Sequence, residues 1–459
     1  MPASRWAVAA LLCALLASLP ACGSGKKSEN VGLEERVDRV LGRMTLEEKI
    51  DQMHGTSIVP VDGLYETPEN KRLGIPSFRM SDGPRGVRIG TATTFPVGMA
   101  RGATWDPPLE QQIGEAMGQE LAAKGGNVLL APTINVLRHP RWGRAQETYG
   151  EDPFQIGEMG AAFIEGAQKW VIANAKHFVA NSIEDVRFDV DVTIDERTLR
   201  EVYMPQFRKA VEQAHVGSVM SAYNSVNGHY CSENAENLGD VLDGDWGFDG
   251  FVVSDWTLGT RSTAPAAKAG LDIEMPAAAY FGDKLLEAVQ QGQVPEKVID
   301  DAVRRILRIK FRFHLDKPEK PPLDVVENDA HRALAQKAEE EAIVLLKNDG
   351  GALPLDRKKI TRLAVVGELA DTVNLGDQGS SNSLPASAVT PLAGIKSLAQ
   401  GVAVDALPGP TLSSADLAKI AADDAAVVVV GLTAKDEGEY MGKGMPGGDR
   451  TTMQLSAEH

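Results

Sequence analysis

The feature that most constrains the fold is a repeated alternation of short apolar runs and helical segments between about residues 45 and 321. Apolar runs flanked by turn residues are typical of strands buried on both faces. Alternating units of this kind predict a parallel α/β architecture, and their number favours a TIM-type (β/α)8-like barrel over 33–316. The predicted strands are 128–135, 171–178, 217–222, 251–255 and 271–275, and the predicted helices between them include 109–124 and 195–214.

Polar side chains stand at the carboxyl ends of the predicted strands. The stretch GFDGFVVSDW, 247–256, places an apolar run directly before Asp255. Lys176 and His177 lie at the end of an earlier run, and Tyr223 follows another. In barrels of this type, the carboxyl ends of the strands build the active site. We therefore expect Asp255 to lie at the mouth of the barrel.

The composition changes after the predicted barrel. The stretch KPEKPP, which begins at Lys317, is typical of a linker. Beyond it, 331–347 has a helical pattern, and the apolar runs 363–366 and 426–430 predict buried strands. We assign 317–330 to the linker and 331–459 to a second α/β domain.

The amino terminus has the pattern of an export signal. Arg5 precedes an apolar stretch from Trp6 to Leu19, and Leu19-Pro20-Ala21-Cys22 resembles a bacterial lipobox. We expect 1–22 to be a signal peptide and Cys22 to be the lipidated first residue of an exported protein, periplasmic or anchored to the envelope. Ordinary cleavage without lipid is the alternative. Residues 23–32 are then expected to form a flexible tether.

Charge and composition argue against several classes of protein. The chain carries 47 Lys and Arg against 64 Asp and Glu, and the net charge of −17 argues against nucleic-acid binding, which depends on cationic contacts to phosphate. No internal stretch approaches the ~20 apolar residues of a membrane span, so membrane contact is expected only through a lipid anchor. The sequence has neither zinc-ligand spacing nor a phosphate-binding glycine loop, and we expect no metal and no cofactor. The sequence leaves the oligomeric state open, and an oligomer is possible by this criterion.

Several longer motifs, taken together, resemble the family 3 glycoside hydrolases, and specifically their β-glucosidase branch. The resemblance runs from about Leu33 to Leu455, and the motifs occur in the family's order. It implies a barrel followed by an α/β sandwich with the active site between them. The motifs are SDGPRGVR from Ser81, GRAQETYGEDP from Gly143, AKHF from Ala175, SAYNSVNG from Ser221, GFDGFVVSDW from Gly247, AGLDIEMP from Ala269 and AIVLLKNDGGALPL from Ala342.

The resemblance also implies roles for individual residues. Asp255 matches the family's nucleophile, which forms a covalent glycosyl intermediate in a retaining, double-displacement mechanism. Trp256 would supply an apolar wall for a sugar face, and Tyr223 falls where the family places a tyrosine against the nucleophile. The remaining sugar ligands implied by the motifs are Asp82, Arg88, Arg144, Lys176 and His177.

The acid/base glutamate of the family comes from the second domain, before a Gly-Asp-Arg sequence. The corresponding region here is DEGEYMGKGMPGGDR, 436–450, in which Glu439 aligns best and Glu437 is the alternative. Such an acid needs a raised pKa to hold its proton near neutrality. Because family members continue well beyond this loop, we expect the sandwich to be incomplete at its carboxyl end, with an unpaired strand edge.

The implied function is a retaining, exo-acting β-glucosidase that releases terminal glucose from oligosaccharides or β-glucosides. Val179-Ala180-Asn181 after the KHF sequence disfavours the N-acetylglucosaminidase branch, and Ala145-Gln146 departs from the residues that commonly follow the Gly-Arg pair. Two alternatives stay open. One is a β-xylosidase or mixed-specificity β-glycosidase, and the other is a catalytically impaired surface lipoprotein that binds sugars.

Overall fold

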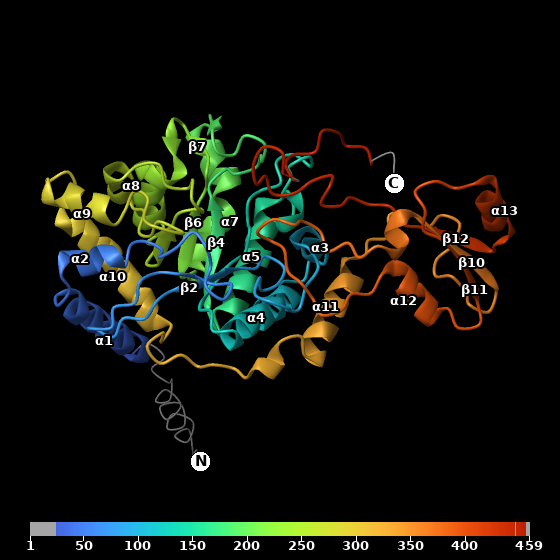
Figure 1. Ribbon diagram of the computed structural model, residues 1–459, viewed down its shortest axis with the longest axis horizontal. Coiled ribbons are helices and arrows are strands. Elements are labelled where there is room, and N and C mark those ends of the chain that lie inside the picture. The colour runs from blue at the N-terminus through green and yellow to red at the C-terminus, as the bar shows by residue number, and fades with distance from the viewer. Residues whose placement is uncertain (1–23, 446, 456–459) are drawn as a thin grey trace, which may run out of the picture.

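The computed structural model describes residues 24–445 and 447–455, which form a large domain and a smaller one beside it (Figure 1). The predicted signal peptide and the predicted lipidation site, Cys22, lie outside the described residues. Within the described residues, no helix has the length and apolar character needed to cross a membrane.

The large domain is built around a closed barrel. Its sheet has the order β1-β2-β3-β4-β6-β9, in which β1 is antiparallel to β2 and the other neighbours are parallel. Irregular segments close the ring: Ile273 bridges Val253, Glu274 bridges His54, and the Thr56 amide donates to the Glu66 carbonyl. The strands are β1 (Tyr65–Glu66), β2 (Arg79–Asp82), β3 (Val128–Leu130), β4 (Ile172–Phe178), β6 (Ser218–Ser221) and β9 (Phe251–Val253).

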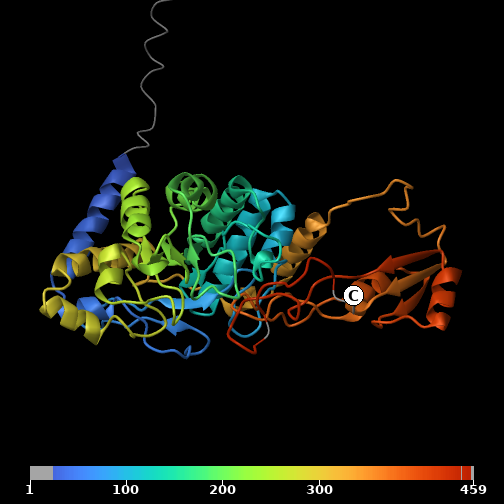
Figure 2. The same cartoon turned by 90° about the horizontal axis from the view of Figure 1, so that it is seen from above.

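Helices cover the outside of the barrel and enclose one large hydrophobic core (Figures 1 and 2). Most of the core strands are buried along their whole length, as the continuous apolar runs predict. The helices are α1 (Ser24–Leu41), α2 (Leu46–Asp51), α3 (Gly98–Ala103), α4 (Pro107–Ala123), α5 (Pro153–Ala167), α6 (Glu196–Thr198), α7 (Pro205–Glu212), α8 (Ala264–Ala269), α9 (Asp283–Gln290) and α10 (Glu296–Arg312).

Several predicted elements are shorter than expected because proline interrupts them. The strand predicted at 128–135 is regular only to Leu130, since Pro132 has no amide hydrogen for the ladder. The helix predicted at 195–214 is divided into α6, a π-helical segment from Leu199 to Tyr203, and α7, which begins at Pro205. Proline fits the first turn of a helix but breaks the interior of one.

The flexible tether predicted at 23–32 is wrong, because α1 begins at Ser24 and continues to Leu41. The segment 23–32 has no proline, but it contains three glycines, which have low helix propensity, so the cause of the helix lies elsewhere. The later part of the helix packs against α10, where Glu34 pairs with Arg308 at 2.6 Å and Val37 is fully buried. This packing stabilises a helix that propagates back into the tether.

The segment predicted to open the second domain packs on the barrel instead. Helix α11 (Asp329–Ala342) contacts α3 and α4, Ala338 belongs to the barrel core, and His331 Nδ1 lies 2.8 Å from Glu120. The helix predicted over 331–347 ends at Ala342. From Ile343 to Leu346 the chain is irregular and exposed, because the β-branched residues there have low helix propensity and contact no core.

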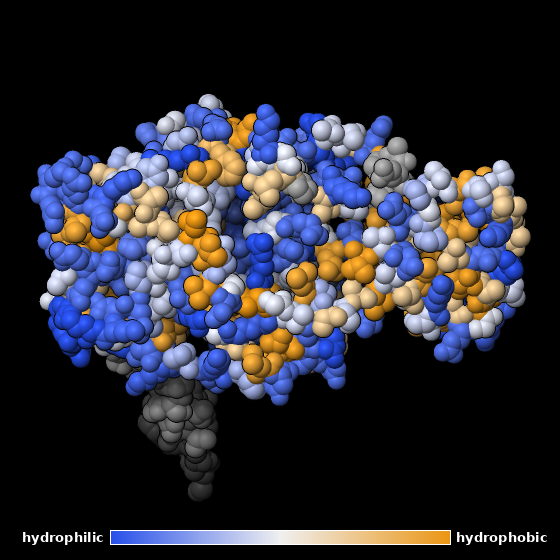
Figure 3. All heavy atoms as spheres, in the orientation of Figure 1, coloured by the Kyte–Doolittle hydropathy of each residue, from blue (hydrophilic) through white to orange (hydrophobic). Residues whose placement is uncertain are grey.

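The second domain is a small α/β sandwich. Its parallel sheet has the order β11-β10-β12, with α12 (Pro391–Leu398) packed on one face and α13 (Ser414–Ala422) on the other. The strands are β10 (Arg362–Val366), β11 (Ala403–Leu407) and β12 (Ala425–Val428), of which β10 and β12 match the predicted runs. Apolar side chains gather on this domain and at its junction with the barrel in the space-filling view (Figure 3). Barrel and sandwich together confirm the predicted fold class.

Two segments return from the second domain to the barrel (Figure 1). In the first, 376–384, the carbonyls of Asp377 and Ser381 accept from the buried Arg85 guanidinium, at 2.7 and 2.8 Å. The second is the 436–450 loop, which follows β12 and lies over the barrel's Gly143. The two segments carry side chains of the second domain to the carboxyl ends of the barrel strands.

Candidate active site

Asp255 follows β9 and lies buried at the carboxyl end of the barrel, with 6% of its surface exposed. Its Oδ1 accepts from the Trp256 amide at 2.8 Å, while Oδ2 has no hydrogen-bond partner among the described residues. Burial raises the pKa of Asp255 to about 6, against the opposing effect of Arg187 and Arg144. The unpartnered oxygen is therefore available for a bond to an electrophile.

Two aromatic residues stand beside Asp255. The Tyr223 hydroxyl donates to the Trp256 carbonyl at 3.0 Å, and burial together with the nearby Asp255 raises the pKa of this tyrosine well above its usual range. The Trp256 ring meets Tyr65 edge-on with centroids 5.2 Å apart. Its indole nitrogen is buried without a partner among the described residues. Tyr223 and Trp256 thus lie beside Asp255.

Asp82, at the end of β2, forms a second charged group. Lys176 Nζ lies 3.6 Å from Asp82 Oδ1, and Arg88 lies 3.6 Å from Oδ2. Burial raises the pKa of Asp82, although both cations oppose this. Lys176 is buried, whereas the Arg88 side chain is half-exposed. Separations longer than a hydrogen bond leave these donors and acceptors free to bind hydroxyl groups.

Arg144 and His177 connect this group to Asp255. The Arg144 guanidinium binds Glu147 through two hydrogen bonds of 2.9 and 2.8 Å and donates to His177 Nε2 at 3.1 Å. Burial and the nearby Arg144 hold the pKa of His177 well below its usual value, so the imidazole is neutral and Nε2 accepts. His177 Nε2 also lies 3.8 Å from Asp255 Oδ2.

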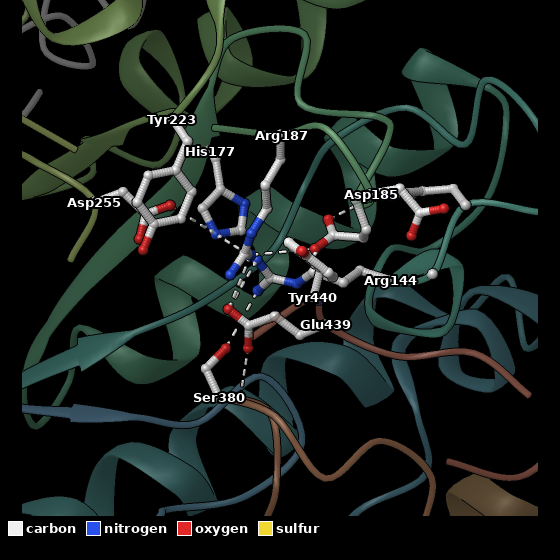
Figure 4. A network of polar contacts seen from close by, with 12 residues as sticks. Arg144, His177, Asp185, Arg187, Tyr223, Asp255, Ser380, Glu439 and Tyr440 are labelled. Carbon is white, nitrogen blue, oxygen red and sulfur yellow. Dashed lines mark hydrogen bonds and ion pairs between the residues drawn. The ribbon is translucent and has the colours of Figure 1, made fainter. Parts of the chain in front are cut away.

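Glu439 enters the site from the 436–450 loop and is buried there. Its Oε1 accepts from Arg187 at 3.0 Å and lies 3.7 Å from Arg144, and its Oε2 accepts from the Ser380 amide at 2.6 Å. In Figure 4, Asp255 and Glu439 lie on two sides of the group formed by Arg144, His177 and Arg187. The second domain therefore contributes a carboxylate to the barrel's strand ends.

The electrostatics of Glu439 differ from the expectation of a raised pKa. Burial alone would raise the pKa of this carboxyl, but Arg144 and Arg187 outweigh it and hold the pKa well below its usual range. Glu439 is thus ionised in the ligand-free protein. Glu439 can act as an acid only if it takes up a proton in the complex with a substrate. That proton can come from solvent or from Asp255, which holds one in the free protein below about pH 6.

Glu437, the alternative acid, has the raised pKa but the wrong surroundings. Burial raises the pKa of Glu437 to about 7, and its nearest cation is Arg450, at 3.9 Å. It lines a separate cavity of about 610 Å³ between the domains, together with Arg85 and Gln146. Because an acid must reach the same bond that the nucleophile attacks, the network shared with Asp255 favours Glu439.

Two family profiles together match most of the chain. Residues 45–309 match the profile "Glycosyl hydrolase family 3 N terminal domain", and 343–459 match "Glycosyl hydrolase family 3 C-terminal domain". The chain belongs to glycosyl hydrolase family 3. Among curated relatives of this family, a β-glucosidase of Rhizobium radiobacter is 41% identical over 375 residues, which are 78% of this chain and 44% of the relative.

Other proteins similar to this chain are also named as β-glucosidases or β-glucoside hydrolases. The thermostable β-glucosidase B of Acetivibrio thermocellus is 39% identical over 76% of this chain and 47% of its own. The solved β-glucosidase 3B of Thermotoga neapolitana, in complex with α-D-glucose, is 34% identical with a TM-score of 0.80, covering 88% of this chain and 63% of its own. The β-D-glucoside glucohydrolase of Trichoderma reesei is 29% identical with a TM-score of 0.84. The chain thus spans less than half the length of the curated relatives it matches.

The site also contains two residues that the sequence did not predict, Arg187 and Ser380. Arg187 binds both Glu439 and Glu184 and lies over the Tyr223 ring at 4.8 Å. Ser380 donates to Glu439 and accepts from Arg144. Neither residue ends a predicted strand, so the rule that located Asp255 could not find them. The only available signal was an arginine within the acidic stretch IEDVRFD after the KHF motif.

Three acidic side chains meet in this family 3 site. Oxygens of Glu147, Asp377 and Glu439 lie within 4.8 Å of one another. Arg144 binds both oxygens of Glu147, and Arg144 and Arg187 face Glu439. Guanidinium groups thus face two of the three carboxylates, whereas the Asp377 carboxylate accepts from the Ser381 hydroxyl and the Glu439 amide, each at 3.3 Å.

Proposed function

We propose that the protein is a retaining, exo-acting β-glucosidase that hydrolyses terminal β-D-glucosyl residues by double displacement. The observation that carries the proposal is the buried Asp255, whose Oδ2 is unpartnered among the described residues, with Glu439 on the other side of a shared cationic group. The glucose complex of the 34% identical Thermotoga relative supports a monosaccharide-sized site and a glucoside as substrate.

In this mechanism, Asp255 Oδ2 attacks the anomeric carbon while the bond to the leaving oxygen breaks. Glu439, which takes up a proton in the complex with the substrate, gives that proton to the leaving oxygen, and the aglycone departs. Glu439 then takes a proton from water, whose oxygen attacks the same carbon and releases Asp255. In the proposed complex, Asp82, Lys176 and Arg88 bind hydroxyl groups of the sugar with charge-assisted hydrogen bonds. Neutral His177 accepts from Arg144, so it acts as a ligand and not as an acid.

The decisive experiment is incubation with dinitrophenyl 2-deoxy-2-fluoro-β-D-glucoside, followed by intact mass and peptide mapping. This reagent requires the nucleophile and hardly requires the acid, because its leaving group departs without a proton. We expect one fluoroglucosyl group on Asp255, and no label on Asp255→Ala. No label on the folded protein would refute the proposal. If the protein hydrolysed aryl xylosides faster than aryl glucosides, we would assign it as a β-xylosidase instead.

We also propose that the protein is exported and anchored by a lipid on Cys22. The apolar stretch from Trp6 to Leu19 and the Leu-Pro-Ala-Cys sequence support this. Metabolic labelling with a radioactive fatty acid, in bacteria that express the full chain, tests the proposal. Label on the protein but not on Cys22→Ser is expected, and equal labelling of both would refute it.

A further inference from the structure

The 436–450 loop is closed at its base by two glycines. Gly448 donates to the Gly438 carbonyl at 2.8 Å, and Gly438 donates back at 3.3 Å. Glu439 directly follows one of these glycines, and Asp449 directly follows the other. Because this bridge is antiparallel, Glu439 lies on the loop side of it and Asp449 on the outer side, each one residue from the bridge, and displacement of one end displaces the other.

Asp449 fastens this base to the barrel. Its carboxylate accepts hydrogen bonds from three barrel amides, those of Gly143 at 2.9 Å, Glu184 at 3.0 Å and Asp185 at 3.1 Å. In return, Asp185 Oδ1 accepts from the Asp449 amide at 2.9 Å. Hydrogen bonds to an ionised carboxylate are about twice as strong as neutral ones. A single side chain of the second domain thus holds two separate barrel segments.

The barrel reaches back to the other end of the loop through Glu184. This buried carboxylate accepts from the Tyr440 amide at 3.1 Å, from the Trp142 indole at 3.0 Å and lies 3.1 Å from Arg187. Tyr440 is the residue after Glu439. The neighbours of Glu439 in the loop are therefore tied to the same barrel segments that carry Arg144 and Arg187.

Close backbone contact leaves little freedom in this arrangement. A side-chain Cβ on Gly143 would lie 2.3 Å from the Gly448 carbonyl oxygen and 2.4 Å from that of Gly438. Both distances are far below van der Waals contact, so the loop base rests directly on the backbone of Gly143.

We infer that Asp449 is a positioning residue for the acid/base group: it docks the base of the 436–450 loop on three barrel amides and thereby places Glu439 at the reacting bond. The inference rests on the proposed glycosidase function. Asp449 itself lies outside the network around Asp255 and does not touch the reacting atoms. Its removal should therefore weaken proton delivery, and leave the attack by Asp255 intact.

The test compares Asp449→Asn with the unaltered protein on phenyl and dinitrophenyl β-glucosides. Asparagine keeps the size of the side chain but replaces one accepting oxygen by an NH2 group. This donor then faces a backbone N–H, which is also a donor, and the hydrogen bond there is lost. We expect kcat/KM for the phenyl glucoside to fall about 10- to 100-fold, as displacement of a catalytic group by ~1 Å does. For the dinitrophenyl glucoside, which needs no acid, kcat/KM should change less than about threefold. Azide should accelerate turnover of the dinitrophenyl glucoside by Asp449→Asn and yield β-glucosyl azide, since this anion needs no base.

Asp436→Asn is the matched control. Its carboxylate is in the same loop but binds Thr433 and not the barrel, so both kcat/KM values should stay within about threefold. Gly143→Ala should reproduce the selective loss of Asp449→Asn from the barrel side. Equal losses on both glucosides, or no loss on the phenyl glucoside, would overturn the inference while the proposed function stands. If the unaltered protein hydrolyses neither glucoside, both fall together.

Discussion

From the pKa values of Asp255 and Glu439, we predict that kcat/KM changes with pH in opposite directions for dinitrophenyl and phenyl β-glucosides. Burial raises the pKa of Asp255 to about 6, while Arg144 and Arg187 hold that of Glu439 well below its usual range. Below pH 6, the free protein therefore carries one proton on this pair, mainly on Asp255, and above pH 6 it loses that proton. A dinitrophenyl glucoside needs only an ionised Asp255, whereas a phenyl glucoside also needs a proton on the pair for delivery by Glu439.

The size of the effect follows from the pKa of Asp255. With a value of about 6, roughly a tenth of Asp255 is ionised at pH 5 and roughly nine tenths at pH 7. Because kcat/KM reports the free enzyme, its value for the dinitrophenyl glucoside should rise about tenfold over this interval. Its value for the phenyl glucoside should fall about tenfold, since the singly protonated pair disappears. The ratio of the two therefore changes about 100-fold.

Both quantities are measured by initial rates at substrate concentrations far below KM, in buffers of constant ionic strength. The rate of labelling by dinitrophenyl 2-deoxy-2-fluoro-β-D-glucoside gives an independent reading of the ionised Asp255. The two profiles should bend at one shared pH, because a single proton governs both. Profiles that rise together, or a labelling rate that is flat from pH 5 to pH 7, would refute this assignment of the proton.

Further predictions concern single side chains. Glu439→Gln should lower kcat/KM for the phenyl glucoside about 100-fold or more and spare the dinitrophenyl glucoside, whereas Glu437→Gln should affect neither; the reverse would make Glu437 the acid. Arg187→Met should shift the bend of both pH profiles upward, because Arg187 lowers the pKa of Asp255, and Arg187→Lys should shift it less; an unmoved bend contradicts this. Asp255→Asn should be more stable by about 3 kcal/mol at pH 7 and by less than about 1 kcal/mol at pH 4. A carboxyl whose pKa is raised on folding contributes fully to the stability of the folded state below its unfolded pKa, and this contribution is lost as the pH rises through 6. Asparagine cannot ionise, so the substituted protein does not lose it. Urea unfolding followed by tryptophan fluorescence measures the difference in unfolding free energy between the two proteins. An equal difference at pH 4 and pH 7 would show that the raised pKa of Asp255 is not its cause.

The barrel could be predicted from the sequence because its information is local. Apolar runs such as that before Asp255 mark buried strands, and the residue that follows each run lies at the carboxyl end of the barrel. The same rule located Lys176, His177 and Tyr223. Element ends were predicted less well where packing decides them. Helix α1 extends into the expected tether because α10 supports it, and α11 ends at Ala342 because nothing packs on the residues that follow.

The second half of the site could not be predicted in the same way. Arg187 and Ser380 lie on irregular segments, and only the folded chain brings them to Glu439 across 252 and 59 residues of sequence. The low pKa of Glu439 likewise arises from cations on the barrel and not from its own loop. The family resemblance predicted Glu439, with Glu437 as the alternative, but the groups that set the charge of Glu439 are distant in the sequence and carry no periodic signal.

The docking of the 436–450 loop on barrel amides has a consequence for hydrogen exchange. The amide protons of Gly143, Glu184 and Asp185 are bound by Asp449, a residue of the other domain. We expect them to exchange with solvent when the loop opens, so that a shared protection factor would give the free energy of that local opening. A ligand that bridges Asp255 and Glu439 should slow all three together. Three barrel amides therefore report how often Glu439 leaves the site.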